Sequence, residues 1–220
     1  MANFFEPSRY IAVEGPIRVG KSTLSNYLAE QLRGQLVQEP AENPFLPAFY
    51  RGEPGAAFQA QMAFLLRRYE QLLPLAQRNP KKIVITDFLF EKDKIFANLN
   101  LNDDELDVYD RYYRMLRSAL PAPDLVIYLQ APVDVLRKRL RRKNDASERD
   151  ISDEYMEEVV KAYEHFFFHY SASDLLVVNT SEIDFVERSQ DLQVLLRRLS
   201  EPIKGTQYFL PLGSQPGSDG

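Results

Sequence analysis

Residues 15–23, which read GPIRVGKST, have the residue types and the spacing of a loop that binds phosphate groups. Gly15 and Gly20 let backbone N–H groups turn toward phosphate oxygens, and Lys21 places a positive charge near the β and γ phosphates. The hydroxyl of Ser22 is the group that contacts Mg²⁺ in such loops. An apolar stretch that reads as a strand (RYIAVE) precedes the loop, and a stretch that reads as a helix (KSTLSNYLAEQLRG) follows it. The pattern and its context therefore predict a nucleotide-binding P-loop.

Two carboxylates are expected at the same edge of the sheet as this loop. Glu39 lies near the end of the stretch QLVQEP, and Asp87 ends the stretch KKIVITD. Ligands of open parallel sheets bind at the carboxyl ends of the strands, where both side chains would lie. One carboxylate can accept a hydroxyl proton while the other supports a metal ion. The alternative for each residue is a helix cap or a solvated strand end.

The elements that must position these groups follow an alternating order. Five expected strands cover residues 9–14, 35–40, 81–87, 123–131 and 174–181, and helical segments separate them. Such alternation indicates an α/β fold with a parallel sheet and helices on both faces. We expect one domain over residues 1–212. The tail GSQPGSDG, residues 213–220, has the composition of a disordered segment.

Charge and composition exclude several classes of function. The net charge of −5 argues against broad binding of a nucleic acid polymer or an acidic membrane surface, and the absence of cysteine fits a reducing cytoplasm. The N-terminus lacks the features of a signal peptide, and no apolar run is long enough to span a bilayer. His165 and His169 lie four residues apart, but no third ligand is evident, so we interpret YEHFFFHY as a buried helix face.

Four segments of the chain together resemble the deoxynucleoside kinase family, particularly the bacterial deoxyadenosine and deoxyguanosine kinases. They are IAVEGPIRVGKSTL, EPAENPFLPAFY, QMAFLLRRYEQL and ERDISDEYMEEVVKAYEHFF, and they occur in the family's order and spacing over nearly the whole chain. The resemblance implies a P-loop kinase fold with a basic lid segment. It also implies transfer of a phosphoryl group from ATP, with Mg²⁺, to the 5′-hydroxyl of a deoxynucleoside in nucleotide salvage. Related enzymes are dimers, so we expect a homodimer or a pair with a related kinase subunit.

The resemblance assigns the acceptor site residue by residue. It implies that Glu39 is the general base and that Tyr50 and the lid residue Glu148 hold the sugar 3′-hydroxyl. It implies that Gln61 and Arg68, with an acidic partner for the arginine, contact the base. Gln61 and Arg68 are seven residues apart, about two helical turns, and so share one helix face. The predicted substrate-binding residues are Glu39, Tyr50, Gln61, Phe64, Arg68, Asp87, Asp93 and Glu148.

Some of these residues have alternative interpretations. Phe58 and Phe64 flank Gln61 as stacking walls or as ordinary core, and Arg68 is alternatively a solvated residue. In this family an arginine–aspartate pair accompanies purine or cytosine acceptors, so the resemblance favours deoxyadenosine, deoxyguanosine or deoxycytidine over thymidine.

A basic segment is expected to close over the donor. Six of the seven residues at positions 137–143 are Arg or Lys, a run that in most proteins is a solvated helix face. The resemblance places Arg139 and Lys143 on cationic lid positions, with Arg141 or Arg142 assisting, and places the donor adenine near residues 181–184. The predicted ATP-binding residues are Gly15, Arg18, Val19, Gly20, Lys21, Ser22, Thr23, Arg139, Lys143, Glu182, Ile183 and Asp184. The predicted catalytic residues are Glu39, Lys21, Asp87 and Arg139, and the predicted Mg²⁺ ligands are Ser22 and Asp87.

The chain departs from the family pattern after the third expected strand. The family has Glu/Asp-Arg-Ser there, whereas this chain has Asp87-Phe88-Leu89, so an arginine expected near the acceptor is absent. Lys92 or Lys94 is the candidate replacement. Asp145 similarly occupies a position where the family has a lid arginine.

Two other functions remain open on the sequence. A nucleoside monophosphate kinase would need a cationic acceptor site, for which Arg51, Arg67 and Arg68 are candidates. A P-loop subunit that binds nucleotide without turnover would explain the missing arginine.

Overall fold

The structure, a computed structural model, describes residues 10–40, 42–78, 82–143 and 151–212. These residues form one sheet of six parallel strands in the order β2-β3-β1-β4-β5-β6. The strands are β1 (Tyr10–Glu14), β2 (Gln35–Val37), β3 (Val84–Thr86), β4 (Leu125–Gln130), β5 (Asp174–Asn179) and β6 (Thr206–Phe209). The α/β fold with a parallel sheet is confirmed. The predicted number of five strands was one too few.

The missed strand is β6, at the edge of the sheet beside β5. Its four residues, TQYF, alternate between exposed and half-buried positions and pair with one neighbour, with Thr206 opposite Leu175. The central strands β1 and β4 instead read as buried apolar runs, as expected for parallel strands that are covered on both faces. The four residues of β6 are too few to give a comparable buried run after the last expected helix.

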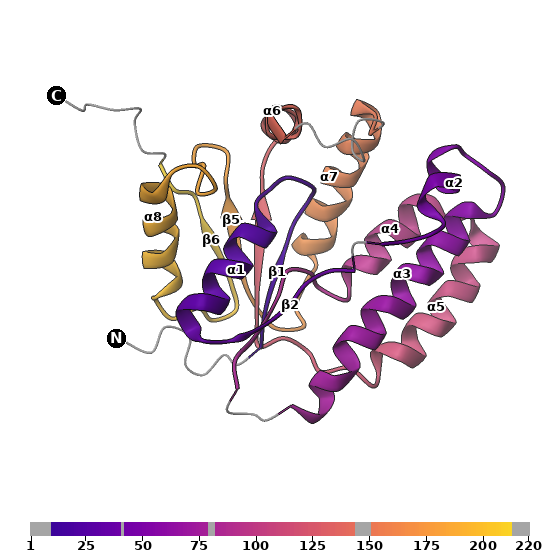
Figure 1. The fold of residues 1–220 in the computed structure, drawn as a ribbon, viewed down its shortest axis with the longest axis horizontal. Coiled ribbons are helices and arrows are strands. Elements are labelled where there is room, and N and C mark those ends of the chain that lie inside the picture. Colours follow the sequence, from indigo (N-terminus) through magenta and orange to yellow (C-terminus); the bar gives the residue numbers. More distant parts are fainter. Residues whose placement is uncertain (1–9, 41, 79–81, 144–150, 213–220) are drawn as a thin grey trace.

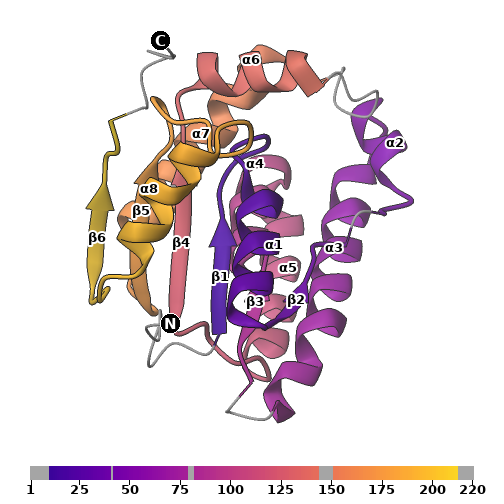
Figure 2. The same ribbon diagram turned by 60° about the vertical axis from the view of Figure 1, so that its left-hand side comes forward.

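Helices cover both faces of the sheet (Figures 1 and 2). Helices α1 and α8 lie on one face and α3, α4, α5 and α7 on the other, while α6 crosses the carboxyl ends of the strands (Figure 2). Their bounds are α1 (Lys21–Leu32), α2 (Leu46–Tyr50), α3 (Ala56–Leu72), α4 (Lys92–Asn100), α5 (Asp103–Arg117), α6 (Val133–Lys143), α7 (Asp153–Phe168) and α8 (Ser189–Leu199), with a 3-10 helix at Leu73–Gln77.

The polar break expected between residues 89 and 120 separates α4 from α5. The side chain of Asn102 accepts from the backbone N–H of Glu105, and the carboxylate of Glu105 accepts from the backbone N–H of Asn102. This reciprocal cap fixes the start of α5. The prediction of one or two helices in this segment therefore resolves to two.

The interpretation of YEHFFFHY as a buried helix face is right for only part of the stretch. Tyr163, Phe167 and Tyr170 are buried, whereas His165, Phe168 and His169 are exposed, so the two histidines do not belong to the buried face. The ring of Phe167 stacks on Tyr128 with centroids 4.0 Å apart, and Tyr163 lies parallel to Tyr128 at 6.2 Å. The imidazole Nδ1 of His169 lies 2.9 Å from the carbonyl oxygen of His165. Over the ranges that the structure describes, no three His, Cys, Asp or Glu side chains group as a metal site would require.

Candidate active site

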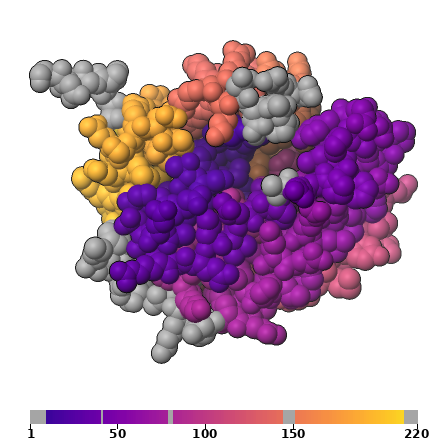
Figure 3. Space-filling model, viewed as in Figure 1, coloured from indigo at the N-terminus to yellow at the C-terminus, as the bar shows by residue number. Residues whose placement is uncertain are grey.

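A cavity of about 790 Å³ opens at the carboxyl ends of the strands. The space-filling view shows the molecule hollowed between α1 and the α2–α3 segment, with α6 above (Figure 3). Its walls come from the P-loop, the segment after β2, and helices α2, α3, α4, α6 and α7. The lining residues include Arg18, Gly20, Lys21, Ser22, Thr23, Glu39, Tyr50, Gln61, Phe64, Arg68, Asp87, Lys92, Arg139 and Lys143. One cavity therefore joins the predicted donor and acceptor residues.

The P-loop backbone requires both of its glycines. A Cβ on Gly15 would lie 2.3 Å from the carbonyl oxygen of Leu129, and Gly20 has a φ of 108°. A Cβ on Gly20 would also lie 2.5 Å from the ring of Phe185. These close approaches leave room for a hydrogen but not for a Cβ, so this loop conformation requires glycine at both positions.

Lys21 lies inside this loop. Its ammonium donates to the carbonyl oxygens of Gly15, at 2.7 Å, and Pro16, at 3.1 Å. Burial, followed by the nearby charge of Lys92, lowers the pKa of Lys21. Lys21 is partly buried and lines the cavity, so an anion that entered the loop would meet an ammonium that water screens only in part.

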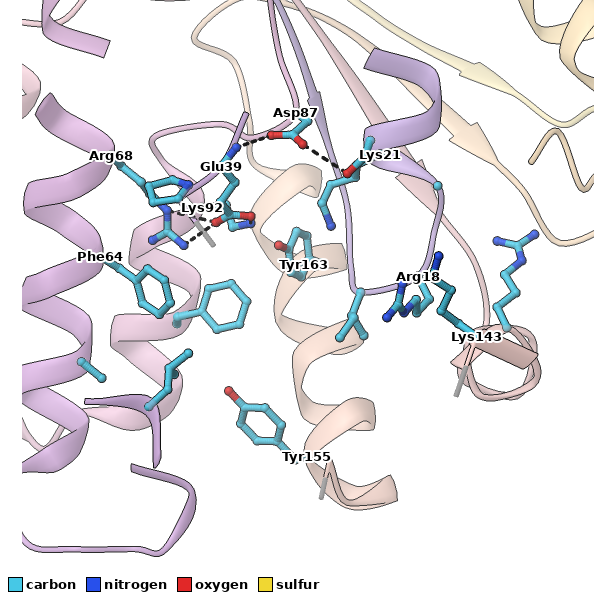
Figure 4. A pocket seen from close by; sticks show the side chains of 18 of the residues that line it. Arg18, Lys21, Glu39, Phe64, Arg68, Asp87, Lys92, Lys143, Tyr155 and Tyr163 are labelled. Atoms are coloured by element: carbon cyan, nitrogen blue, oxygen red, sulfur yellow. Dashed lines mark hydrogen bonds and ion pairs between the residues drawn. The ribbon is translucent and has the colours of Figure 1, made fainter. Parts of the chain in front are cut away.

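Asp87 connects the P-loop to the segment after β2 (Figure 4). Its Oδ2 accepts from the hydroxyl of Ser22 at 3.1 Å, and its Oδ1 accepts from the backbone N–H of Glu39 at 2.5 Å. A hydroxyl and a carboxylate that meet beside a phosphate loop are the oxygen ligands that Mg²⁺ prefers. Ser22 and Asp87 therefore fit a magnesium ion that takes its other ligands from phosphates and water.

Glu39 lies between two cations. Its Oε1 accepts from Arg68 Nη2 at 2.6 Å and Nε at 3.2 Å, and its Oε2 accepts from Lys92 Nζ at 2.8 Å. Burial alone would raise the pKa of Glu39, but the charges of Lys92, Arg68 and Lys21 together hold the pKa of this carboxyl below its ordinary value. The side chain is therefore a carboxylate at neutral pH, which a proton acceptor must be.

Arg68 belongs to a buried polar cluster that the sequence partly anticipated. Its guanidinium binds Glu39 and Asp93, and its side chain is 4% exposed, so the solvated alternative is wrong. Asp93 also accepts from the hydroxyl of Tyr109 at 2.9 Å and from the amide of Gln61. The guanidinium lies over the ring of Phe64, 4.8 Å from its centroid. Phe64 lines the cavity with Gln61 and Arg68, whereas Asp93 is fully buried and does not line it, and Phe58 packs against the core.

The residues predicted for the sugar are placed only in part. Tyr50 lines the cavity at the end of α2 and is half exposed. Glu148 lies outside the described residues, as do Asp145 and the tail 213–220. Two tyrosines of α7 that the sequence analysis did not select, Tyr155 and Tyr163, also line the cavity. Their spacing of eight residues puts them on one helix face, a signal that ordinary core residues share.

The donor side combines expected and unexpected contacts. The guanidinium of Arg139 donates to Thr180 Oγ1 at 3.1 Å and to the carbonyl oxygens of Thr180, at 2.8 Å, and Ile183, at 2.9 Å. These contacts of the side chain therefore hold the segment after β5, the predicted site of the donor adenine. Asp184 pairs with Arg142 at 2.9 Å.

The other predicted donor residues differ in their surroundings. Lys143 lies on the same side of the cavity as Arg18 (Figure 4). The side chains of Val19 and Ile183 are buried in the core, so only their backbone groups can serve a ligand. Val186 and Glu187, which the sequence analysis did not select, line the cavity.

Of the two candidates for the missing cation, Lys92 lies in the site. Lys94 instead pairs with Asp110 at 3.6 Å and lies over the ring of Tyr113. Phe88 and Leu89, which stand where the family has arginine and serine, are fully buried in two different parts of the core. Lys92, three residues beyond Leu89, thus supplies the cation beside Glu39. Its position is set by the first turn of α4.

Comparisons with known proteins agree with this geometry. The family model described as "Deoxynucleoside kinase" matches residues 11–204. A deoxyguanosine kinase of Bacillus subtilis (strain 168) is 32% identical over 88% of this chain and 97% of its own length. A deoxyadenosine kinase of Lactobacillus acidophilus is 26% identical over 88% of this chain and 96% of its own.

Solved structures agree as well. A structure of deoxyadenosine kinase from M. mycoides with dCMP and dCDP bound superposes with a TM-score of 0.72. It is 25% identical and covers 86% of this chain and 98% of its own. The matched region includes the P-loop, the acceptor cluster and the basic segment. The chain belongs to the deoxynucleoside kinase family and is a kinase that phosphorylates deoxynucleosides.

Proposed function

We propose that this kinase transfers the γ-phosphoryl group of ATP to the 5′-hydroxyl of a purine deoxynucleoside, with deoxycytidine accepted more readily than thymidine. The observation that carries the proposal is the buried cluster of Gln61, Arg68 and Asp93. Arg68 of this cluster binds Glu39, and Glu39 lines the same cavity as the P-loop. An amide and a guanidinium held in this way form a rigid set of hydrogen-bonding groups for a base edge, as amides and arginines do toward purines elsewhere.

The chemistry follows from the position of Glu39. Glu39 takes the proton of the 5′-hydroxyl while that oxygen forms a bond to the γ-phosphorus, and the bond between that phosphorus and the bridging oxygen of ADP breaks. Lys21 neutralises charge on the transferring group, and the glycine-rich backbone holds the phosphates. Mg²⁺, held by Ser22 and Asp87, would supply further charge neutralisation when bound.

Binding residues complete the proposed assignment. Tyr50 and Glu148 hold the 3′-hydroxyl, Phe64 stacks on the base, and Asp93 orients Gln61 and Arg68. On the donor side, Lys143 and Arg18 face the phosphates, and Arg139 shapes the segment that receives the adenine. The named activities of the relatives support these roles, and so does the cavity for Tyr50, Phe64 and the three cations, which line it. The role of Glu148 rests on the family resemblance alone.

The monophosphate kinase alternative lacks the cationic site that it requires. Arg51 pairs with Glu53 at 2.8 Å on the surface, and Arg67 donates to the carbonyl oxygen of Glu42. The charge of Arg68 is balanced by Glu39 and Asp93. The three arginines therefore do not present a common positive surface to an acceptor phosphate.

We further propose that the chain works as a single domain, residues 1–212, in the cytoplasm, as a homodimer or with a related kinase subunit. The family resemblance and the one continuous sheet support this proposal. Within the described residues, none of the helices combines the length and the apolar character needed to cross a bilayer.

The base preference is tested by steady-state kinetics with the four deoxynucleosides at fixed ATP and Mg²⁺. We expect kcat/KM for deoxyguanosine or deoxyadenosine to exceed that for thymidine by at least about 10-fold, because one mispaired polar contact costs roughly 1–3 kcal/mol. Thymidine as the best substrate would contradict the assignment of the Gln61–Arg68–Asp93 cluster while leaving the kinase activity itself intact.

A further inference from the structure

Lys92 is a buried cation that lies between two carboxylates. Its side chain is 5% exposed, and Nζ lies 2.8 Å from Glu39 Oε2 and 3.6 Å from Glu14 Oε1. It is the first residue of α4, and it lines the cavity beside Glu39 (Figure 4). Burying an ammonium costs several kcal/mol unless it is paired, so this arrangement depends on both acidic partners.

Glu14 fixes one end of this arrangement. It is fully buried at the end of β1, and both of its oxygens have donors. Oε1 accepts from the backbone N–H of Gly15 at 2.8 Å and from the hydroxyl of Tyr163 at 3.0 Å, and Oε2 accepts from the backbone N–H of Leu89 at 2.7 Å. These bonds join the first residue of the P-loop, helix α7 and the turn after β3 in one place. A carboxylate bound in this way cannot rotate, and it gives Lys92 a fixed counter-charge.

The turn after β3 brings Lys92 to that counter-charge. The backbone N–H of Lys92 donates to the carbonyl oxygen of Leu89 at 3.2 Å, while the side chains of Phe88 and Leu89 are buried away from the cavity. The turn therefore supplies no cation from the two positions after Asp87. The start of α4 supplies one, and Lys92 approaches the Oε2 side of Glu39, whereas Arg68 binds Oε1.

Each oxygen of Glu39 thus has one cationic partner. Arg68 is in turn held by Asp93, so the carboxylate is fixed from two directions by two independently anchored cations. A general base must lie within hydrogen-bond distance of the proton that it takes, and misplacement by 1 Å is enough to lower a rate by about 10²-fold.

We propose that Lys92, anchored by Glu14, is a positioning residue that orients the Glu39 carboxylate toward the acceptor hydroxyl. The inference rests on the proposed role of Glu39 as general base. It adds Lys92 as the residue that links Glu39 to Glu14 at the end of β1. Lys92 acts through Glu39 and neither gives nor takes a proton in the transfer step.

The test is a double-mutant cycle of Lys92→Met with Glu39→Gln in the full chain. Methionine keeps the length of the side chain and removes the ammonium. We expect Lys92→Met alone to lower kcat by about 30- to 100-fold, with KM for the deoxynucleoside changed less than about 3-fold. In the Glu39→Gln background the same change is expected to lower kcat by less than about 3-fold, because residues that act as a unit are not additive.

The matched control is Lys94→Met. Lys94 lies on the same helix but pairs with Asp110, and its side chain is 38% exposed. We expect kcat within about 2-fold of the unchanged chain, since surface ion pairs contribute little. Lys92→Arg, which keeps the charge, should recover at least about 5-fold of the loss in kcat. The midpoint of thermal unfolding and the Kd for ATP establish whether each variant is folded. If Lys92→Met does not fold, Lys92→Gln takes its place in the double-mutant cycle.

Two results would overturn the proposal. If Lys92→Met lowers kcat by the same factor in the original chain and in the Glu39→Gln variant, Lys92 acts independently of the carboxylate. If Lys92→Met leaves kcat unchanged, Lys92 has no role in the reaction. A failure of the base assignment is recognised separately, because Glu39→Gln alone would then keep near-normal turnover.

Discussion

Replacing Lys21 with methionine is expected to lower kcat by about 10³-fold, the upper end of what one charged donor contributes to a transition state. The ammonium lies within the P-loop, 2.7 Å from the carbonyl oxygen of Gly15, where the backbone and the start of α1 surround the site of the phosphates. Methionine fills the same space, so the loop should keep its shape while the charge on the transferring group is no longer neutralised.

The measurement is kcat with saturating ATP, Mg²⁺ and deoxynucleoside, together with KM for ATP. Lys204→Met serves as the control. This lysine is 71% exposed and pairs with Asp174 at the start of β5, whereas the cavity lies at the other ends of the strands. Its turnover should match that of the unchanged chain. A Lys21→Met enzyme that is folded and retains turnover within about 10-fold would show that this residue is not the phosphate-neutralising cation.

Replacing Glu39 with glutamine is expected to lower kcat by at least about 10²-fold, the usual contribution of a general base. Glutamine has nearly the same shape and its amide oxygen can still accept from Arg68, but it cannot take a proton. The substitution also leaves Lys92 without one of its two carboxylates. The loss should therefore appear mainly in kcat, with KM for the deoxynucleoside changed much less.

Glu53→Gln is the matched control for this variant. Glu53 is a solvent-exposed glutamate that pairs with Arg51, and its loss should leave turnover unchanged. Both variants are compared for thermal unfolding, so that a defect in folding is not mistaken for a defect in chemistry. Near-normal turnover of Glu39→Gln would remove Glu39 from the role of base.

Local signals were sufficient for the parts of the molecule that depend on neighbouring residues. The P-loop pattern, the buried strands β1 and β4 and the break between α4 and α5 are each encoded within a few residues of sequence. The strand β6 was missed because it has only four residues and stands between a glycine and a proline-containing segment, so its Thr, Tyr and Phe form a strand signal too short to be selected without the pairing with β5. Here the tertiary pairing agrees with the strand preference of these residues, and only the short length hid it.

The functional site was predictable where the family pattern holds and less so where it departs. Glu39, Gln61, Arg68 and Asp93 were expected near one another, and the structure brings them together. Glu14 was not selected, because a glutamate at the end of an apolar strand gives no indication of its partners. Those partners, Leu89 and Tyr163, are 75 and 149 residues away in the chain. Contacts over such separations are set by topology and are invisible to patterns of spacing.

Arg139 illustrates the same difficulty in another form. A basic run identifies a cationic segment but does not say which of its side chains face the nucleotide. The structure shows that Arg139 binds two carbonyl oxygens of the segment after β5, which is 41 to 44 residues further along. Its role therefore depends on the packing of α6 against that segment.

The most direct test of the account offers the purified chain ATP and Mg²⁺ with each deoxynucleoside and, separately, each deoxynucleoside 5′-monophosphate, and identifies the products by mass and by the position of the new phosphate. We expect the deoxynucleosides to become 5′-monophosphates and the monophosphates to remain unchanged. Phosphorylation of the monophosphates alone, or no turnover with any acceptor, would contradict the claim that Glu39 and the Gln61–Arg68–Asp93 cluster receive a deoxynucleoside.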